Sequence, residues 1–240
     1  MKARSPRRFL RWLLLVAALS LAAFALHAWL TWPDVAALAR EDPATTAFVE
    51  RWRARERAAG RRGEAGPRFV AYGRISNELK LAVVVAEDID FFSHRGFATT
   101  EMKRALEKAW EEKEAPRGAS TITQQLAKNL WLSPSRNPLR KLEEAALTRQ
   151  LERHLPKRRI LELYLNVVEF GPGVWGCENA ARRYFGKPAS SLGEREAAQL
   201  AAALPRPSTW HPGAGGRGYA RHVERILARM RGSAWVRREL

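Results

Sequence analysis

Three segments of the sequence combine acids, hydroxyls, amides and cations in patterns that suit catalysis. The first is EDIDFFSHRG, residues 87–96, in which acidic residues follow an apolar stretch and precede two aromatic residues and a turn. A carboxylate that is partly withdrawn from water at the end of an apolar helix has a raised pKa and is a stronger base. Glu87 is therefore a candidate general base, although the same pattern is also typical of a solvated helix end.

The second segment is GASTITQQLAKN, residues 118–129, which places hydroxyls, amides and a lysine around the start of a predicted helix. Helix N-termini bind anions because their first backbone N–H groups have no partner within the helix. Thr121 and Gln124 also match a capping box. The segment therefore favours either an anion site or an ordinary capped amphipathic helix.

The third segment is RKLEE, residues 140–144, which follows Arg136. Glu144 continues the apolar stripe of a predicted helix, formed by Leu147, Leu151 and Leu155. An acid near an apolar face is costly unless it is paired or functional. Glu143 is nearly as well placed relative to Leu147, so the periodicity does not separate the two acids.

Helical patterns dominate the parts of the chain that must position these segments. We expect helices at residues 45–59, 78–91, 99–114, 121–131, 137–155, 158–168, 178–184, 192–204 and 219–230. No run alternates with period two for long enough to require a sheet. The sequence thus predicts a mainly α fold with its candidate groups on helices or at their entry loops.

An uncharged segment, residues 12–32, precedes the helical region and contains no Lys, Arg, Asp or Glu. About 20 apolar residues suffice for a helix to cross a bilayer. Basic residues precede it and tryptophans mark its ends, which predicts a cytoplasmic tail at residues 1–11 and a transmembrane anchor. The alternative is a cleaved signal peptide, but residues 25–28 match its cleavage site poorly. Residues 33–67 would form a connector, and residues 68–240 a domain outside the cytoplasm.

The charge balance of the 240 residues is strongly basic, with 42 Lys and Arg against 25 Asp and Glu, a net charge of +17. Such a field attracts nucleic acid, anionic membranes or phosphorylated substrates. The only cysteine is Cys177. It excludes an internal disulfide and argues against a cysteine-based metal site.

Taken together, the motifs resemble those of one family, the biosynthetic peptidoglycan transglycosylases. Residues 87–96 resemble its first motif and residues 118–129 its second, while RKLEE resembles the third and selects Glu144 over Glu143. KRRILELYLN at residues 157–166 and GVWGCENAARRYFGK at residues 173–187 resemble the fourth and fifth, although Trp175 and Cys177 are unusual there. The likeness covers roughly residues 68–210 in matching order.

The resemblance implies a lysozyme-like helical domain that polymerises lipid II, a disaccharide-pentapeptide carried on undecaprenyl diphosphate. Glu87 would deprotonate the acceptor's sugar hydroxyl, which attacks the anomeric carbon of the growing glycan with inversion. Because undecaprenyl diphosphate leaves as an anion, fixed positive charge is needed. The resemblance gives that role to Lys128, Arg136, Arg140 and Lys141, while Glu144 would orient these cations or the donor sugar.

The resemblance further implies a set of substrate-binding residues: Asp88, Phe91, His94, Ser120, Thr121, Gln124, Gln125, Lys128, Asn129, Arg136, Arg140 and Lys141. A divalent cation, Mg or Mn, is often used in the family, but no sequence feature shows a site for one. The implied partners are lipid II, the glycan strand, the membrane, and cell-wall synthesis or division proteins, with no nucleic acid. No Ser-x-x-Lys follows the domain, which resembles the monofunctional type.

Three other functions compete with this interpretation. A lytic muramidase of the same fold would use its Glu as an acid on an intact glycosidic bond, but it does not need the cations that follow Gln125. A basic nucleic-acid-binding membrane protein has only the net charge in its favour and no recognition motif. A nucleotide enzyme would explain the G-x-G-x-x-G match at residues 171–176, but this match follows a helical pattern instead of a buried strand.

Overall fold

The computed structural model describes residues 6–63, 66–98, 120–133 and 138–240. The chain divides into two units, Met1–Asp34 and Val35–Leu240. The first contains helix α1, Pro6–Thr31, whose described large apolar side chains are exposed, among them Leu13, Leu19 and Leu30. A search of the described residues finds no helix that is both long enough and apolar enough to cross a membrane.

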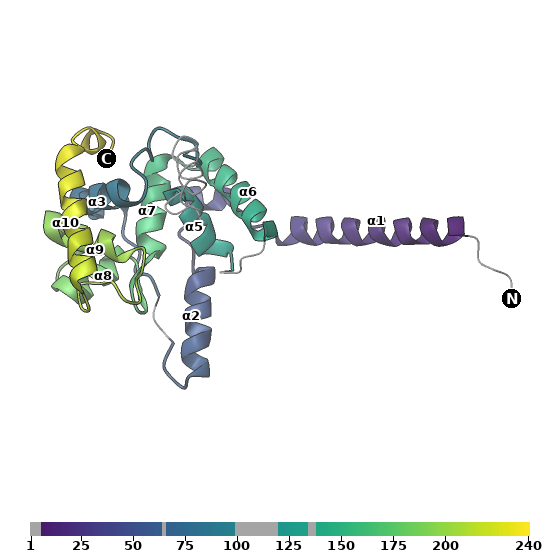
Figure 1. The fold of residues 1–240 in the computed structure, drawn as a ribbon, viewed down its shortest axis with the longest axis horizontal. Helices are drawn as coiled ribbons and strands as arrows, with labels where there is room; N and C mark the ends of the chain where they lie inside the picture. Colours follow the sequence, from purple (N-terminus) through teal and green to yellow (C-terminus); the bar gives the residue numbers. More distant parts are fainter. Residues whose placement is uncertain (1–5, 64–65, 99–119, 134–137) are drawn as a thin grey trace. The chain divides into compact units, whose positions relative to one another are not determined.

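The second unit is mainly helical, as predicted (Figure 1). Its α-helices are α2 (Ala47–Ala58), α3 (Asn77–Glu87), α5 (Ile122–Trp131), α6 (Pro138–His154), α7 (Lys157–Val167), α8 (Cys177–Phe185), α9 (Glu194–Ala203) and α10 (Arg217–Gly232). Short 3₁₀ helices occupy Ala36–Ala39, Tyr72–Arg74, Ala189–Ser191 and Val236–Arg238. The helix predicted at residues 99–114 lies outside the described residues.

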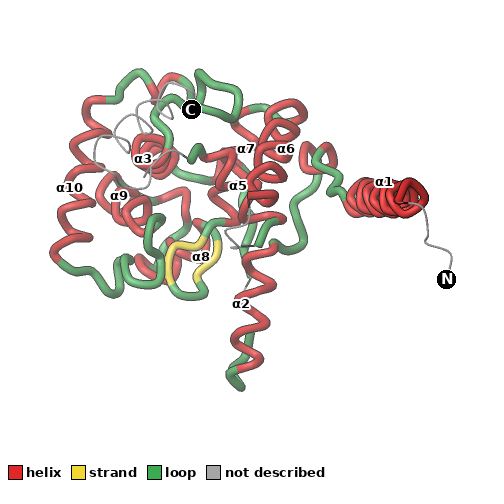
Figure 2. Tube along the Cα trace, turned by 45° about the vertical axis from the view of Figure 1, so that its right-hand side comes forward, coloured by secondary structure: helices red, strands yellow, loops and turns green. Residues whose placement is uncertain are grey.

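Two groups of helices build the core, and the site lies between them. Helix α3 packs against α9 and α10, while α5 packs against α6 and α7, an arrangement that can be followed in Figure 2. Helix α3 begins where Ser76 caps the backbone N–H of Leu79. Residues 79–85 of this helix are all buried, so its C-terminal residue is held firmly where α3 approaches α5.

Helix α3 ends at Glu87, four residues before the predicted end at Phe91. The next residue, Asp88, has a non-helical backbone (φ −163°, ψ 79°). Its carboxylate accepts a hydrogen bond from the backbone N–H of Ile122 at 3.0 Å. Because this bond joins two distant segments, helical periodicity could not reveal where the helix stops.

The sequence did not predict the small antiparallel hairpin formed by β1 (Glu169–Gly171) and β2 (Val174–Trp175). Gly173 has φ +70° in its turn, and an added Cβ would meet the ring of Trp52 at 2.6 Å. The G-x-G-x-x-G match thus lies in and just after an antiparallel hairpin, which is not the βαβ context of a dinucleotide site. Trp175 and Cys177 are buried, and burial raises the pKa of Cys177 to about 12, so this thiol is inert.

Part of the predicted connector packs onto the second unit. Val35, Leu38 and Val49 are buried, and helix α2 contacts α5. Arg159 of α7 donates hydrogen bonds to the carbonyl oxygens of Leu38 and Glu41, both at 2.8 Å. Residues 35–58 therefore help to form the domain, and α2 reaches the helix that carries the second motif.

Candidate active site

Glu87, the last residue of α3, has a half-buried side chain. Gln125 of α5 donates a hydrogen bond from Nε2 to Glu87 Oε2 at 2.7 Å. Burial is the main reason why the pKa of Glu87 is raised, and Asp88 adds to it, while the Gln125 hydrogen bond and Lys128 act in the opposite direction. A carboxylate in this setting accepts a proton more readily than one in water.

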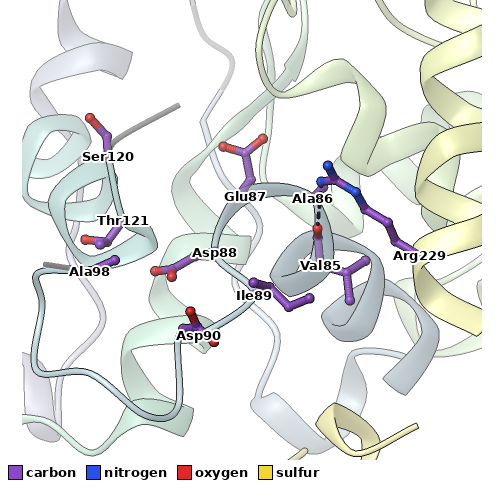
Figure 3. Close-up of a pocket in the computed structure, with 10 residues that line it drawn as sticks. All are labelled: Val85, Ala86, Glu87, Asp88, Ile89, Asp90, Ala98, Ser120, Thr121 and Arg229. Carbon is purple, nitrogen blue, oxygen red and sulfur yellow. Dashed lines mark hydrogen bonds between the residues drawn. The ribbon is translucent and has the colours of Figure 1, made fainter. Parts of the chain in front are cut away.

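A pocket of about 460 Å³ opens beside Glu87 (Figure 3). Its walls are Val85, Ala86, Glu87, Asp88, Ile89, Asp90, Ala98, Ser120, Thr121 and Arg229. Figure 3 shows Glu87 between Ser120 at the entry to α5 and Arg229 of α10. Arg229 donates a hydrogen bond to the backbone carbonyl of Val85 at 3.3 Å. The pocket thus joins a base, a hydroxyl and a cation.

Asp88 and His94 connect the first motif to the second. The Asp88 carboxylate is buried and lies 2.8 Å from His94 Nε2. The backbone N–H of Gly96 donates to His94 Nδ1 at 3.1 Å, which leaves the ring proton on Nε2, facing Asp88. Together with the bond from Ile122, these contacts fasten residues 88–96 to the start of α5. They give Asp88 and His94 a positioning role, and substrate binding by either residue stays a prediction.

The capping box at the start of α5 is confirmed. Thr121 accepts a hydrogen bond from the backbone N–H of Gln124, and the Gln124 side chain accepts one from the backbone N–H of Thr121. Thr121 also donates to the carbonyl of Gly96 at 2.7 Å. Asn129 donates to the carbonyl of Gln125 at 2.8 Å. The side chains of Thr121, Gln124 and Asn129 thus form hydrogen bonds to other groups of the protein. Ser120, by contrast, is exposed and lines the pocket.

Phe91 is fully buried. Its ring packs edge-on against Phe92, with centroids 5.0 Å apart, and Lys157 Nζ lies over the Phe91 ring, 4.4 Å from its centroid. Phe91 therefore supports the loop after Glu87 from within the core, and the structure gives it no exposed surface for a substrate.

A group of cations surrounds Glu144 on α6. Glu144 is buried, whereas Glu143 is exposed, which agrees with the motif's choice of Glu144. Arg140 donates from Nη1 to Glu144 Oε2 at 2.9 Å, and Lys141 donates to Oε1. Glu144 therefore fixes two predicted cations in place. Arg136 lies outside the described residues.

Lys128 of α5 links this cation group to the base. Burial lowers the pKa of Lys128, as do Arg140 and Lys141, while Glu144 and Glu87 raise it. The charges of both acids therefore act on Lys128, whose side chain is half-buried. Phe48 of α2 lies beneath it, with Lys128 Nζ 5.8 Å from the ring centroid.

Among the described residues, no three His, Cys, Asp or Glu side chains are grouped so that they could hold a metal ion. Two acids of the motifs already have partners, since Asp88 binds His94 and Ile122 while Glu144 binds Arg140 and Lys141. The described residues therefore do not by themselves supply a site for the divalent cation that the family resemblance implies.

Comparison with known proteins shows which family the chain belongs to. The family model described as Transglycosylase matches residues 55–231. The chain belongs to the transglycosylase family. It is 50% identical over 190 residues to a protein of Aromatoleum aromaticum named "Biosynthetic peptidoglycan transglycosylase", covering 79% of this chain and 82% of that one. It is 42% identical over 221 residues to the protein of that name from Laribacter hongkongensis, covering 92% and 97%.

The sequence patterns did not single out two residues that lie at this transglycosylase's site, Tyr164 and Arg229. Tyr164 donates a hydrogen bond to Gln125 Oε1 at 2.8 Å, but four-residue spacing from Ile160 made it resemble an ordinary core residue. Arg229 lines the pocket, but it is one of several arginines on α10 and belongs to no motif. Because Tyr164 lies within the fourth motif, the motif match could have marked it as a site residue. No sequence pattern marks Arg229.

Proposed function

We propose that this transglycosylase polymerises lipid II into glycan strands, with Glu87 as the general base. The observation that carries the proposal is a carboxylate held at a pocket, with Lys128 close enough to lower its pKa and with Arg140 and Lys141 fixed by Glu144 on the neighbouring α6. The carboxylate suits removal of a proton from a sugar hydroxyl. The cations suit departure of a diphosphate, and both belong to one reaction.

The acceptor's sugar hydroxyl would enter the pocket and approach Glu87 Oε1, because Oε2 is held by Gln125. Its proton passes to Glu87 as the hydroxyl oxygen attacks the anomeric carbon of the growing strand. The bond from that carbon to the diphosphate oxygen breaks, and the electron pair leaves with undecaprenyl diphosphate. Attack from the face opposite the leaving group inverts the anomeric carbon.

Lys128, Arg140 and Lys141 would stabilise the negative charge that develops on the leaving diphosphate. Glu144 keeps Arg140 and Lys141 in place, so the charge need not be assembled during the reaction. By the motif match, Arg136 would join this cation group.

A lysozyme-like hydrolase is the second candidate, because a raised pKa would also suit Glu87 as a general acid. The cation group argues against it, since hydrolysis of an uncharged linkage releases no diphosphate. Incubation of the full chain with labelled lipid II in detergent tests the two functions. The polymerase converts lipid II to long strands and releases undecaprenyl diphosphate, whereas the hydrolase leaves lipid II intact and cleaves finished glycan.

Arg229 is proposed to bind the acceptor sugar of the incoming lipid II, because its guanidinium lines the pocket that holds Glu87. The Arg229→Ala variant is expected to raise KM for lipid II about tenfold and to lower kcat much less, since a charge-assisted contact contributes about 1.5–3 kcal/mol. Steady-state kinetics measure both values. Arg225→Ala is the control, because Arg225 lies one turn earlier on α10, is exposed and contacts His222. Equal effects of the two substitutions would contradict a specific role for Arg229.

The anchor is proposed from the full sequence of residues 12–32, which has no charged residue, and from the exposed apolar side chains of α1. An N-terminal span with a cytoplasmic basic tail would hold the catalytic unit outside the cytoplasm, beside a substrate that cannot leave the membrane. The full chain made in bacteria is expected to stay in the membrane pellet after an alkaline carbonate wash. Its release into the supernatant would contradict the anchor.

A further inference from the structure

Tyr164 forms the buried end of a hydrogen-bond relay that reaches the base. Its side chain is fully buried on α7. The hydroxyl donates to Gln125 Oε1 at 2.8 Å, and Gln125 Nε2 donates to Glu87 Oε2 at 2.7 Å. We propose that Tyr164 is a positioning residue that orients the Gln125 amide so that its N–H group holds Glu87 in the ionised, proton-accepting form. This inference rests on the proposed function of Glu87.

The direction of the amide determines which form of Glu87 is stabilised. An amide has a donor end and an acceptor end, whereas a tyrosine hydroxyl can donate or accept. With Nε2 toward Glu87, the carboxylate must be ionised to accept the bond. With the amide reversed, Oε1 would face Glu87, and only a protonated carboxyl could donate to it. The two arrangements therefore correspond to the two charge states of the base.

With Nε2 toward Glu87, the proton of the buried Tyr164 hydroxyl has its acceptor in Oε1, which a reversed amide would take away. Tyr164 presents its O–H to Oε1, while the backbone carbonyl of Ser120 lies 3.5 Å from Nε2. A carbonyl can only accept, so it disfavours the reversed amide. Because the amide is held at both ends, Glu87 Oε1 is left for the substrate.

Tyr164 keeps its proton while it performs this role. Burial raises its pKa well above the ordinary value, and the charges of Glu87 and Asp88 raise it further. The hydroxyl therefore remains a donor over the working pH range. A phenylalanine at this position would leave Gln125 Oε1 without its partner, so the amide would be held only from its Nε2 side.

Other charged groups also act on Glu87 from the elements packed around it. Asp88 follows it in the chain and Lys128 faces it from α5, while Asp90 and Arg229 line the same pocket. Tyr164→Phe leaves all of these charges in place. A change in the titration of Glu87 in that variant is therefore attributable to the relay.

The test is the pH dependence of kcat/KM for lipid II polymerisation by the full chain. Loss of the tyrosine hydroxyl weakens stabilisation of ionised Glu87 and so raises its pKa. The acidic limb of the Tyr164→Phe profile is expected to move up by roughly one pH unit. At a pH on the acidic limb, the kcat/KM of Tyr164→Phe is expected to be about tenfold below that of the native chain. At higher pH the two values should converge, and KM should be the same in both proteins.

Tyr219→Phe is the matched control, because Tyr219 is also buried and donates to the carbonyl of Gln199 at 2.9 Å, away from the pocket. Its profile should not move. Gln125→Met should move the limb in the same direction, and adding Tyr164→Phe to it should change nothing more. This double substitution distinguishes an effect that passes through Gln125 from a general loss of packing.

A Tyr164→Phe chain that loses activity equally at every pH would overturn the inference, as would a further shift in the Gln125→Met background. If Tyr164→Phe does not fold, an unmoved limb in Gln125→Met overturns it instead. A native chain that forms no polymer from lipid II refutes the proposed function and not the relay. The relay is then tested by NMR titration of ¹³C-labelled Glu87, where an unchanged pKa in Tyr164→Phe overturns it.

Discussion

Replacement of Glu87 by Gln is expected to slow lipid II polymerisation by about 10²–10⁴-fold, the usual loss when a general base is removed. The amide has nearly the same size and still fills the end of α3, but it cannot take the proton from the acceptor hydroxyl. Binding of lipid II should change little, so the loss should appear in kcat.

The measurement is the initial rate of polymer formation at saturating lipid II. Glu143→Gln is the control, because it makes the same chemical change on the exposed face of α6, next to the acid that holds the cations. Its rate should match that of the native chain. Full activity in Glu87→Gln would show that another group accepts the proton.

Replacement of Lys128 by Met should lower kcat by about 10²–10³-fold, the loss typical when one preorganised charge-stabilising group is removed. Methionine keeps the length and apolar stem of lysine but carries no charge to meet the leaving diphosphate. Lys128 also lowers the pKa of Glu87. Its loss should therefore raise that pKa and move the acidic limb of the rate profile to higher pH.

Arg195→Met is the control for charge alone, since Arg195 is exposed on α9 and pairs with Glu224 at 2.9 Å. It should leave both kcat and the pH profile unchanged. A Lys128→Met variant that changes only KM would assign Lys128 to ground-state binding and contradict its role in departure of the diphosphate.

Local patterns predicted those parts of the site that depend on neighbours in the chain. The capping box joins residues three apart, and Arg140 and Lys141 reach Glu144 within one turn of α6. Apolar periodicity likewise located most of the helices within a few residues of their bounds. The choice between Glu143 and Glu144 needed more than periodicity, and the motif supplied it.

Other parts depend on contacts between distant segments, which no local pattern reveals. Asp88 accepts a bond from a residue 34 positions away, and Tyr164 reaches Gln125 across 39 positions. The motif resemblance predicts that Gln125 binds the substrate, whereas both ends of its amide have protein partners. Arg229 enters the pocket only because α10 packs against α3.

The pH dependence of kcat/KM for lipid II polymerisation distinguishes a base from an acid at Glu87. A base acts when ionised, so activity should fall as the pH drops through the pKa of Glu87, which burial raises above its ordinary value of 4.5. The residual activity of Glu87→Gln should lack this limb. A rate that increases as the pH falls through that range, or a limb that persists in Glu87→Gln, would contradict the assignment of Glu87 as the base.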